Sequence, residues 1–145
     1  MAHSGMAQAL KVLLADTYTL YLKTQNYHWN VTGAEFFSLH KMFEEQYESL
    51  AEATDEIAER IRALNVKSPG SFTEFNSLKT ISEAKNEIAG REMITELKSA
   101  HEHIAKQLGL MIEQAGKEND FVTQDLLIGR LAFHDKTIWM LASHL

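Results

Sequence analysis

Apolar side chains recur at steps of three and four residues along most of the chain, which is the period of an α-helix. The pattern predicts four long helices, at about residues 5–31, 35–64, 83–116 and 121–144. The breaks between them contain the residues that interrupt helices, at Gly33, at Pro69-Gly70 and from Gly116 to Asp120. The hydrophobic pattern therefore indicates an all-α fold.

The second and third predicted helices are separated by a long connection. Within it, Phe72, Phe75 and Leu78 keep a three-residue spacing, which predicts a short extra helix. Two tight links and one long crossover are typical of a ferritin-like four-helix bundle rather than a simple up-and-down bundle. Because no repeat or shift of composition divides the chain, we expect residues 1–145 to form a single domain.

Composition narrows the chemistry that the chain can perform. The 145 residues include no cysteine, which excludes disulfides, thiolate zinc sites, iron–sulfur clusters and cysteine nucleophiles. Any metal site must therefore use nitrogen and oxygen ligands, and we expect no organic cofactor. The formal net charge of −6 repels polyanions such as DNA. No signal peptide or membrane span is evident, so the expected location is the cytoplasm.

Five carboxylates share one face of the second predicted helix, because they recur at three and four residues: Glu44, Glu48, Glu52, Asp55 and Glu59. One interpretation is a solvated charged face, which is common on exposed helices. The other is a surface that binds a hard metal ion, since carboxylates one turn apart can reach the same cation. Histidine near these carboxylates would favour the second interpretation.

His28 and His40 flank the predicted turn at Gly33. If the first two helices form a hairpin there, His28, His40 and Glu44 could cluster at its end. The helical rise of about 1.5 Å per residue places His28 about 8 Å from the turn and Asp55 about 33 Å from it. One chain cannot join them, so a shared site requires a second chain packed about a twofold axis, which would create two equivalent sites.

A di-iron site within a single bundle normally shows Glu-x-x-His on two helices. None of the seven histidines has a glutamate three residues before it. This absence argues against a site inside one subunit and favours one that is divided between two.

The same residues resemble the ferroxidase signature of the Dps family of mini-ferritins, and the resemblance covers nearly the whole chain. The matching segments are His28-Trp-Asn-Val-Thr-Gly33, Phe37-Ser-Leu-His40, Glu44 and Asp55-Glu-Ile-Ala-Glu-Arg60. The resemblance implies that His28, His40 and Glu44 of one subunit bind iron together with Asp55 and Glu59 of its twofold mate.

The resemblance also implies a biological role. It predicts a ferroxidase that oxidises Fe(II), with hydrogen peroxide as oxidant, stores a ferric mineral in a dodecameric shell and so protects against oxidative damage. Trp29 would accept oxidising equivalents, although an ordinary core or interface tryptophan is the simpler account. Asp120 and Asp125 would line an iron-admitting pore, with helix capping as the alternative role.

Two other functions compete with iron oxidation. The first is a DNA-binding architectural protein of the nucleoid with secondary iron chemistry. It is disfavoured because residues 1–10 contain no Lys or Arg and the sequence ends at Ser143-His-Leu145, so neither terminus supplies a basic tail. The second is a structural shell whose acidic face is only solvated.

Overall fold

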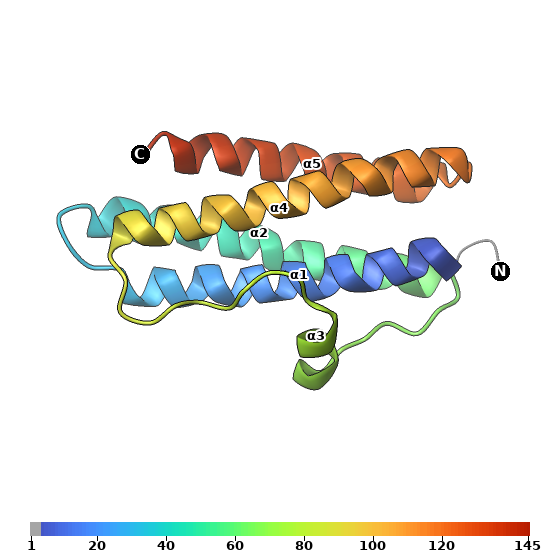
Figure 1. The fold of residues 1–145 in the computed structure, drawn as a ribbon, viewed down its shortest axis with the longest axis horizontal. Coiled ribbons are helices and arrows are strands. Elements are labelled where there is room, and N and C mark those ends of the chain that lie inside the picture. The colour runs from blue at the N-terminus through green and yellow to red at the C-terminus, as the bar shows by residue number, and fades with distance from the viewer. Residues whose placement is uncertain (1–3) are drawn as a thin grey trace.

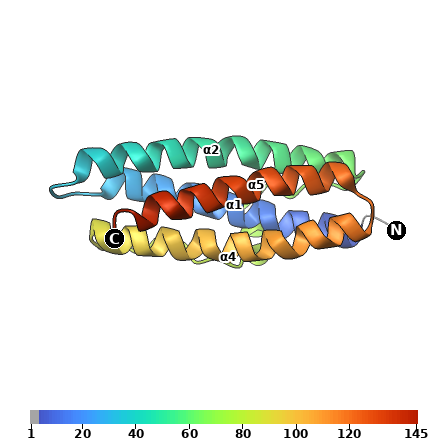
Figure 2. The same cartoon turned by 90° about the horizontal axis from the view of Figure 1, so that it is seen from above.

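Five helices make up the fold in the computed structural model, which describes residues 4–145. Their bounds are α1 (Ser4–Asn30), α2 (Phe36–Ala63), α3 (Phe72–Leu78), α4 (Gly90–Lys117) and α5 (Phe121–Ala142). Figure 1 shows the four long helices packed as a bundle, with the short α3 outside it beside α1. In Figure 2, α2 and α4 run in one direction and α1 and α5 in the other. The predicted all-α bundle with an extra short helix is confirmed.

The core is formed by the apolar stripe of each long helix. On α2, the predicted stripe is buried at Phe43, Leu50, Ile57 and Ile61, which are each 0% exposed. The stripe of α4 continues it with Leu97, Ile104 and Leu108. No helix among residues 4–145 is long and apolar enough to cross a membrane.

Residues with a positive φ end or link the helices. Gly33, with φ of 106°, lies in the turn between α1 and α2, where a side chain would strain the backbone. Asn65, with φ of 68°, follows α2, and Asn119, with φ of 57°, follows α4. Asparagine tolerates this left-handed conformation better than most residues. The end of α2 at Ala63 agrees with the predicted end at about residue 64.

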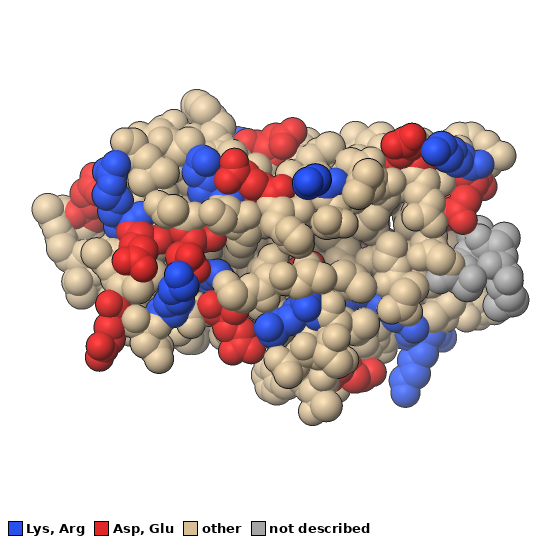
Figure 3. All heavy atoms as spheres, in the orientation of Figure 1, with Lys and Arg blue, Asp and Glu red and all other residues tan. Residues whose placement is uncertain are grey.

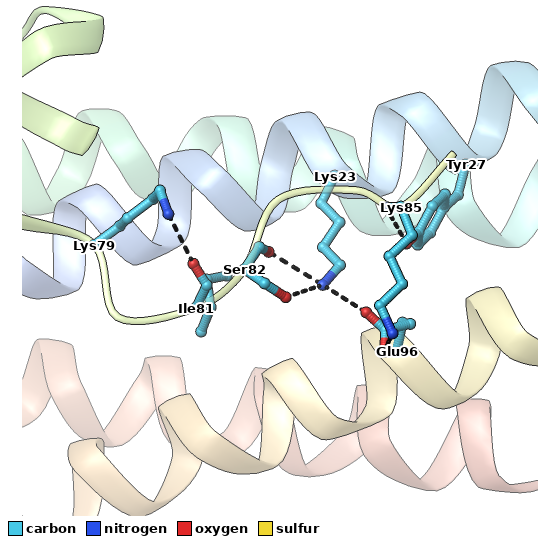
Figure 4. Close-up of polar contacts among 7 residues, drawn as sticks. All are labelled: Lys23, Tyr27, Lys79, Ile81, Ser82, Lys85 and Glu96. Carbon is cyan, nitrogen blue, oxygen red and sulfur yellow. Dashed lines mark hydrogen bonds and ion pairs between the residues drawn. The ribbon is translucent and has the colours of Figure 1, made fainter. Parts of the chain in front are cut away.

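The predicted start of the third long helix at residue 83 is wrong, because α4 begins at Gly90. The preceding segment is held by side chains of α1 and α4 instead of by helical hydrogen bonds (Figure 4). Lys23 of α1, which is 2% exposed, donates to the carbonyl and hydroxyl oxygens of Ser82 at 3.1 and 3.2 Å, and to Glu96 of α4 at 3.3 Å. Lys85 pairs with the same carboxylate at 3.1 Å.

A buried carboxylate holds the beginning of this crossover in the same way. Asp16 of α1, which is 3% exposed, accepts from the backbone N–H of Thr80 at 2.6 Å and from that of Ile81 at 3.2 Å. The Thr80 hydroxyl donates to the other oxygen of the carboxylate at 2.6 Å. Hydrogen bonds to α1 thus satisfy backbone N–H groups of the crossover. Helical periodicity in the sequence could not reveal these bonds.

We expect Lys23→Met to loosen the crossover. The variant loses three hydrogen bonds made by a buried ammonium, and the unfolding free energy should fall by about 2 kcal/mol. Urea denaturation measures the loss, and amide hydrogen exchange should accelerate most across residues 80–88. Lys117→Met is the matched control, because Lys117 forms only an exposed pair with Glu113. Equal stability of the two variants would contradict this role for Lys23.

Candidate metal centre

His28 and His40 form a reciprocal pair where α1 and α2 meet. The Nδ1 atom of each ring lies 2.7 Å from the backbone oxygen of the other residue. The rings stack with centroids 3.8 Å apart and an interplanar angle of 13°. A carbonyl oxygen only accepts, so each Nδ1 must carry the proton that it donates. In each neutral ring Nε2 then holds a free lone pair, as a metal-binding histidine requires.

Aromatic neighbours fix the positions of these two rings. Phe36 stacks on His40 with centroids 4.9 Å apart, and Tyr47 meets the His28 ring edge-on at 5.1 Å. His28 is 6% exposed, whereas His40 is half-buried. The pair is therefore preorganised by packing as well as by hydrogen bonds.

Glu44 lies one turn after His40 on α2 and is partly exposed. Its carboxylate accepts from Lys41 at 3.4 Å, and the lysine side chain is 54% exposed. An exposed pair of this kind contributes little energy, so an incoming cation can displace Lys41. Glu44 is therefore free to move, but the described residues include no group of three His, Asp or Glu side chains that could hold a metal ion, so its role as a ligand with the histidines stays a prediction.

Asp55 and Glu59 lie on the distal half of the same helix and are both exposed. Asp55 is fifteen residues beyond His40, or about 22 Å along the axis. Within the described chain, no three His, Asp or Glu side chains are placed to hold a metal ion. The structure thus brings His28 and His40 together and leaves Asp55 and Glu59 apart from them. Whether the two sets meet across two chains stays a prediction.

The other predicted site residues occupy separate places. Trp29 is 60% exposed, so it is not a core tryptophan of the single chain. Asp120 is the N-cap of α5 and accepts from the Thr123 N–H at 3.2 Å and from Arg60 at 3.0 Å. Asp120, which is only 7% exposed, therefore caps α5, the role given above as the alternative to lining a pore. Asp125 is exposed, and a pore role for either aspartate stays a prediction.

A second histidine pair lies inside the bundle, and sequence reasoning did not identify it. The Nδ1 atoms of His101 on α4 and His134 on α5 are 2.8 Å apart, and both residues are 0% exposed. Burial, with a smaller effect of the Arg130 charge, lowers the pKa of His101 to about 3. Burial also lowers the pKa of His134, as do His101 and Arg130. The pair is therefore neutral. In the sequence, the one sign of this pair is His101, a polar residue within the apolar seam of the helix that forms α4.

Comparisons with known proteins indicate one family for the chain. The ferritin-like domain family matches residues 7–145. The DNA protection during starvation protein of Helicobacter pylori is 36% identical over 139 residues, covering 95% of this chain and 96% of that protein. An uncharacterized low temperature-induced protein of Nostoc is 38% identical, covering 96% of this chain and 79% of that protein.

Solved structures show the same relationship in three dimensions. The Dps protein of Vibrio cholerae is 34% identical with a TM-score of 0.94, covering 98% of this chain and 89% of that one; it is described as one of the ferritin-like diiron-carboxylate proteins. Dps from Staphylococcus aureus is 37% identical with a TM-score of 0.93, covering 96% and 93%. With the bundle, the short outer helix and the sequence all shared, the chain belongs to the Dps family of ferritin-like proteins.

Proposed function

We propose that this protein is a ferroxidase and iron store whose oxidation sites lie between two subunits. The observation that carries the proposal is the reciprocal bonding of His28 and His40, which uses Nδ1 of each ring and leaves Nε2 of each ring for a metal ion at one end of the hairpin. Neutral imidazole suits ferrous iron, and carboxylates suit the harder ferric product. Asp55 and Glu59 supply such carboxylates only if a second chain is present.

The proposed dimer is antiparallel about a twofold axis. The hairpin end of each chain, with His28, His40 and Glu44, would lie against Asp55 and Glu59 of the other chain. Each dimer would then contain two identical sites. The family resemblance leads us to expect a closed shell of twelve subunits. Such a shell would enclose the ferric mineral.

Ferrous iron and hydrogen peroxide are the proposed substrates. Each peroxide molecule accepts one electron from each of two ferrous ions as its O–O bond breaks, so no hydroxyl radical is released. Hydrolysis of the ferric product releases protons, which the surrounding carboxylates can pass to solvent. The histidines hold the ferrous ions, and the carboxylates balance the charge that develops on oxidation.

The surface charge supports a cationic substrate better than a nucleic acid. Figure 3 shows acidic and basic side chains interspersed over one face of the molecule, and the chain has a formal net charge of −6. The starvation-protection proteins among the relatives are named for protecting DNA. In this protein we attribute such protection to the removal of iron and peroxide rather than to DNA binding.

The stoichiometry of the reaction tests the proposal. Protein loaded with Fe(II) without oxygen should consume two ferrous ions for each peroxide added, and a spin trap should detect far less hydroxyl radical than in a protein-free control. Consumption of one ferrous ion per peroxide, with free radical release, would show that the protein does not perform this chemistry.

A further inference from the structure

A cluster of polar side chains lies inside the bundle and includes no residue of the proposed iron site. Its charged member is Arg130 of α5, which is 8% exposed and whose guanidinium carbon lies 4.6 Å from the centre of the Phe133 ring. That ring meets the His134 ring at 5.2 Å and the His101 ring at 6.1 Å. The guanidinium is thus packed beside the buried histidine pair.

The charge of Arg130 has no counterion in the single chain. None of the ion pairs among residues 4–145 includes Arg130, and its Nη2 atom is buried without a hydrogen-bond partner. Burial lowers the pKa of Arg130 to about 10, so the guanidinium is still charged at neutral pH. Glu56 partly opposes this effect, but it is exposed on α2. Burying a charge without a partner is unfavourable, and an ion of opposite sign would remove this cost.

The histidine pair presents a hydrogen-bond donor beside this charge. The Nδ1 atoms of His101 and His134 are 2.8 Å apart, so one Nδ1 donates its proton and the other accepts. The accepting ring is neutral and must therefore carry its own proton at Nε2. Both Nε2 atoms are buried, and neither has a partner. One buried imidazole N–H thus lacks an acceptor.

Gln46 brings a third polar group from α2. It is 5% exposed, and neither its amide nitrogen nor its amide oxygen has a partner. α2 and α5 are antiparallel (Figure 2), and the hydrogen bond from Arg60 to the Thr123 hydroxyl, at 2.8 Å, aligns them. At about 1.5 Å per residue, Gln46 lies about 21 Å from that bond and His134 about 17 Å from it, in the same direction. The two residues are therefore within about one helical turn of each other.

We propose that Arg130, the histidine pair and Gln46 line a buried site for one small monovalent anion such as chloride. The histidines are neutral, so a single negative charge balances the guanidinium. The unpaired groups include N–H donors from the guanidinium, one imidazole and the amide, and a halide ion accepts from all three. Arg130 would repel a cation, and a water molecule would satisfy the hydrogen bonds but leave the charge unbalanced.

The site joins three of the four long helices within one chain. Its donors come from α2, α4 and α5, so the bound anion would link these helices across the core. Neither the donors nor the anion take part in the proposed iron chemistry. The anion should therefore bind whether or not the protein oxidises iron, and failure of either proposal leaves the other standing.

Anomalous X-ray scattering from bromide tests the site directly, because bromide replaces chloride and can be located by its absorption edge. Crystals of the iron-free assembled protein soaked in sodium bromide should show an anomalous peak in every subunit, in contact with Nη2 of Arg130 and Nε2 of one histidine. Crystals of Arg130→Gln should lack this peak and keep any bromide bound at the surface. A wild-type pocket that is empty or holds only water would overturn the proposal.

Equilibrium dialysis against radioactive chloride, with gluconate as the balancing anion, tests the site in solution. The wild-type assembly should bind one chloride per subunit, and Arg130→Gln should bind it at least about tenfold more weakly, because the charged donor is lost. Arg91→Gln is the matched control, because Arg91 is exposed on α4, and it should keep the wild-type affinity.

Gln46→Leu removes the amide donor at similar volume and takes the place of Arg130→Gln if that variant does not assemble. It should also bind chloride more weakly than the wild type. Wild-type protein that binds no chloride, or that binds it with the same affinity as the pocket variant, would overturn the proposal.

Discussion

Replacing Asp55 by asparagine, or Glu59 by glutamine, is expected to lower the rate of iron-dependent peroxide consumption by at least about tenfold. Each change removes one negative charge and one ligand of the ferric product while keeping the shape of the side chain. Because the amide variants keep the size of the side chain and its hydrogen-bonding oxygen, the thermal midpoint of the assembled protein should change little. Stopped-flow absorbance of the ferric product and light scattering measure the two quantities.

Glu45→Gln is the matched control for these variants. Glu45 is an exposed glutamate on the same helix, but it lies outside the row of carboxylates that includes Glu44 and Asp55. The control should oxidise iron at the wild-type rate. If all three variants were equally active, Asp55 and Glu59 would be part of a solvated face and not of an iron site.

Acid should weaken the bundle at a pH where its carboxylates are still ionised, because His101 and His134 are buried as neutral rings. The pKa of His101 is about 3 in the folded protein, against its ordinary value of 6.5. The unfolded state therefore binds more protons as the pH falls below 6.5, and stability is lost progressively from there towards pH 3. For His101 alone the unfolding free energy should drop by about 2 kcal/mol between pH 6.5 and pH 5.

The double variant His101→Gln/His134→Gln should lose most of this dependence, since amides keep hydrogen-bonding groups but do not titrate. His144→Gln, beyond the end of α5, should retain it. Asp120 affects the stability only at lower pH. Burial raises the pKa of its carboxyl group, but hydrogen bonds from Thr123 and Arg60 outweigh burial and hold that pKa below 3.8. Urea denaturation at pH 6.5 and pH 5 measures the drop in unfolding free energy. If the double variant lost as much stability between these pH values as the wild type, the buried histidines would not be the cause.

Local patterns were sufficient to predict the bundle from sequence. Three- and four-residue spacing located the helices, and Gly33 marked the turn between the first two because it adopts a positive φ. The start of α4 was missed because long-range contacts decide it. Lys23 binds Ser82 from fifty-nine residues away, and no local propensity encodes such a contact.

The candidate site was predictable only in part for a related reason. Helical rise separates His28 from Asp55, so the sequence could show that one chain does not hold the whole site. It could not show that His28 and His40 exchange hydrogen bonds, which depends on how the hairpin closes. The exposure of Trp29 was also unexpected, because periodicity assigns a residue to a helix face but does not reveal what covers that face.

The central claim is that each iron site takes ligands from two chains, and mixed assemblies of two inactive variants test it most directly. His28→Ala and Asp55→Ala should each be inactive alone. In a dimer that contains one chain of each, one site lacks both ligands and the other is intact. Random co-assembly should therefore restore about a quarter of the wild-type rate. No recovery in verified mixed assemblies would show that the site does not join His28 and Asp55 of different chains.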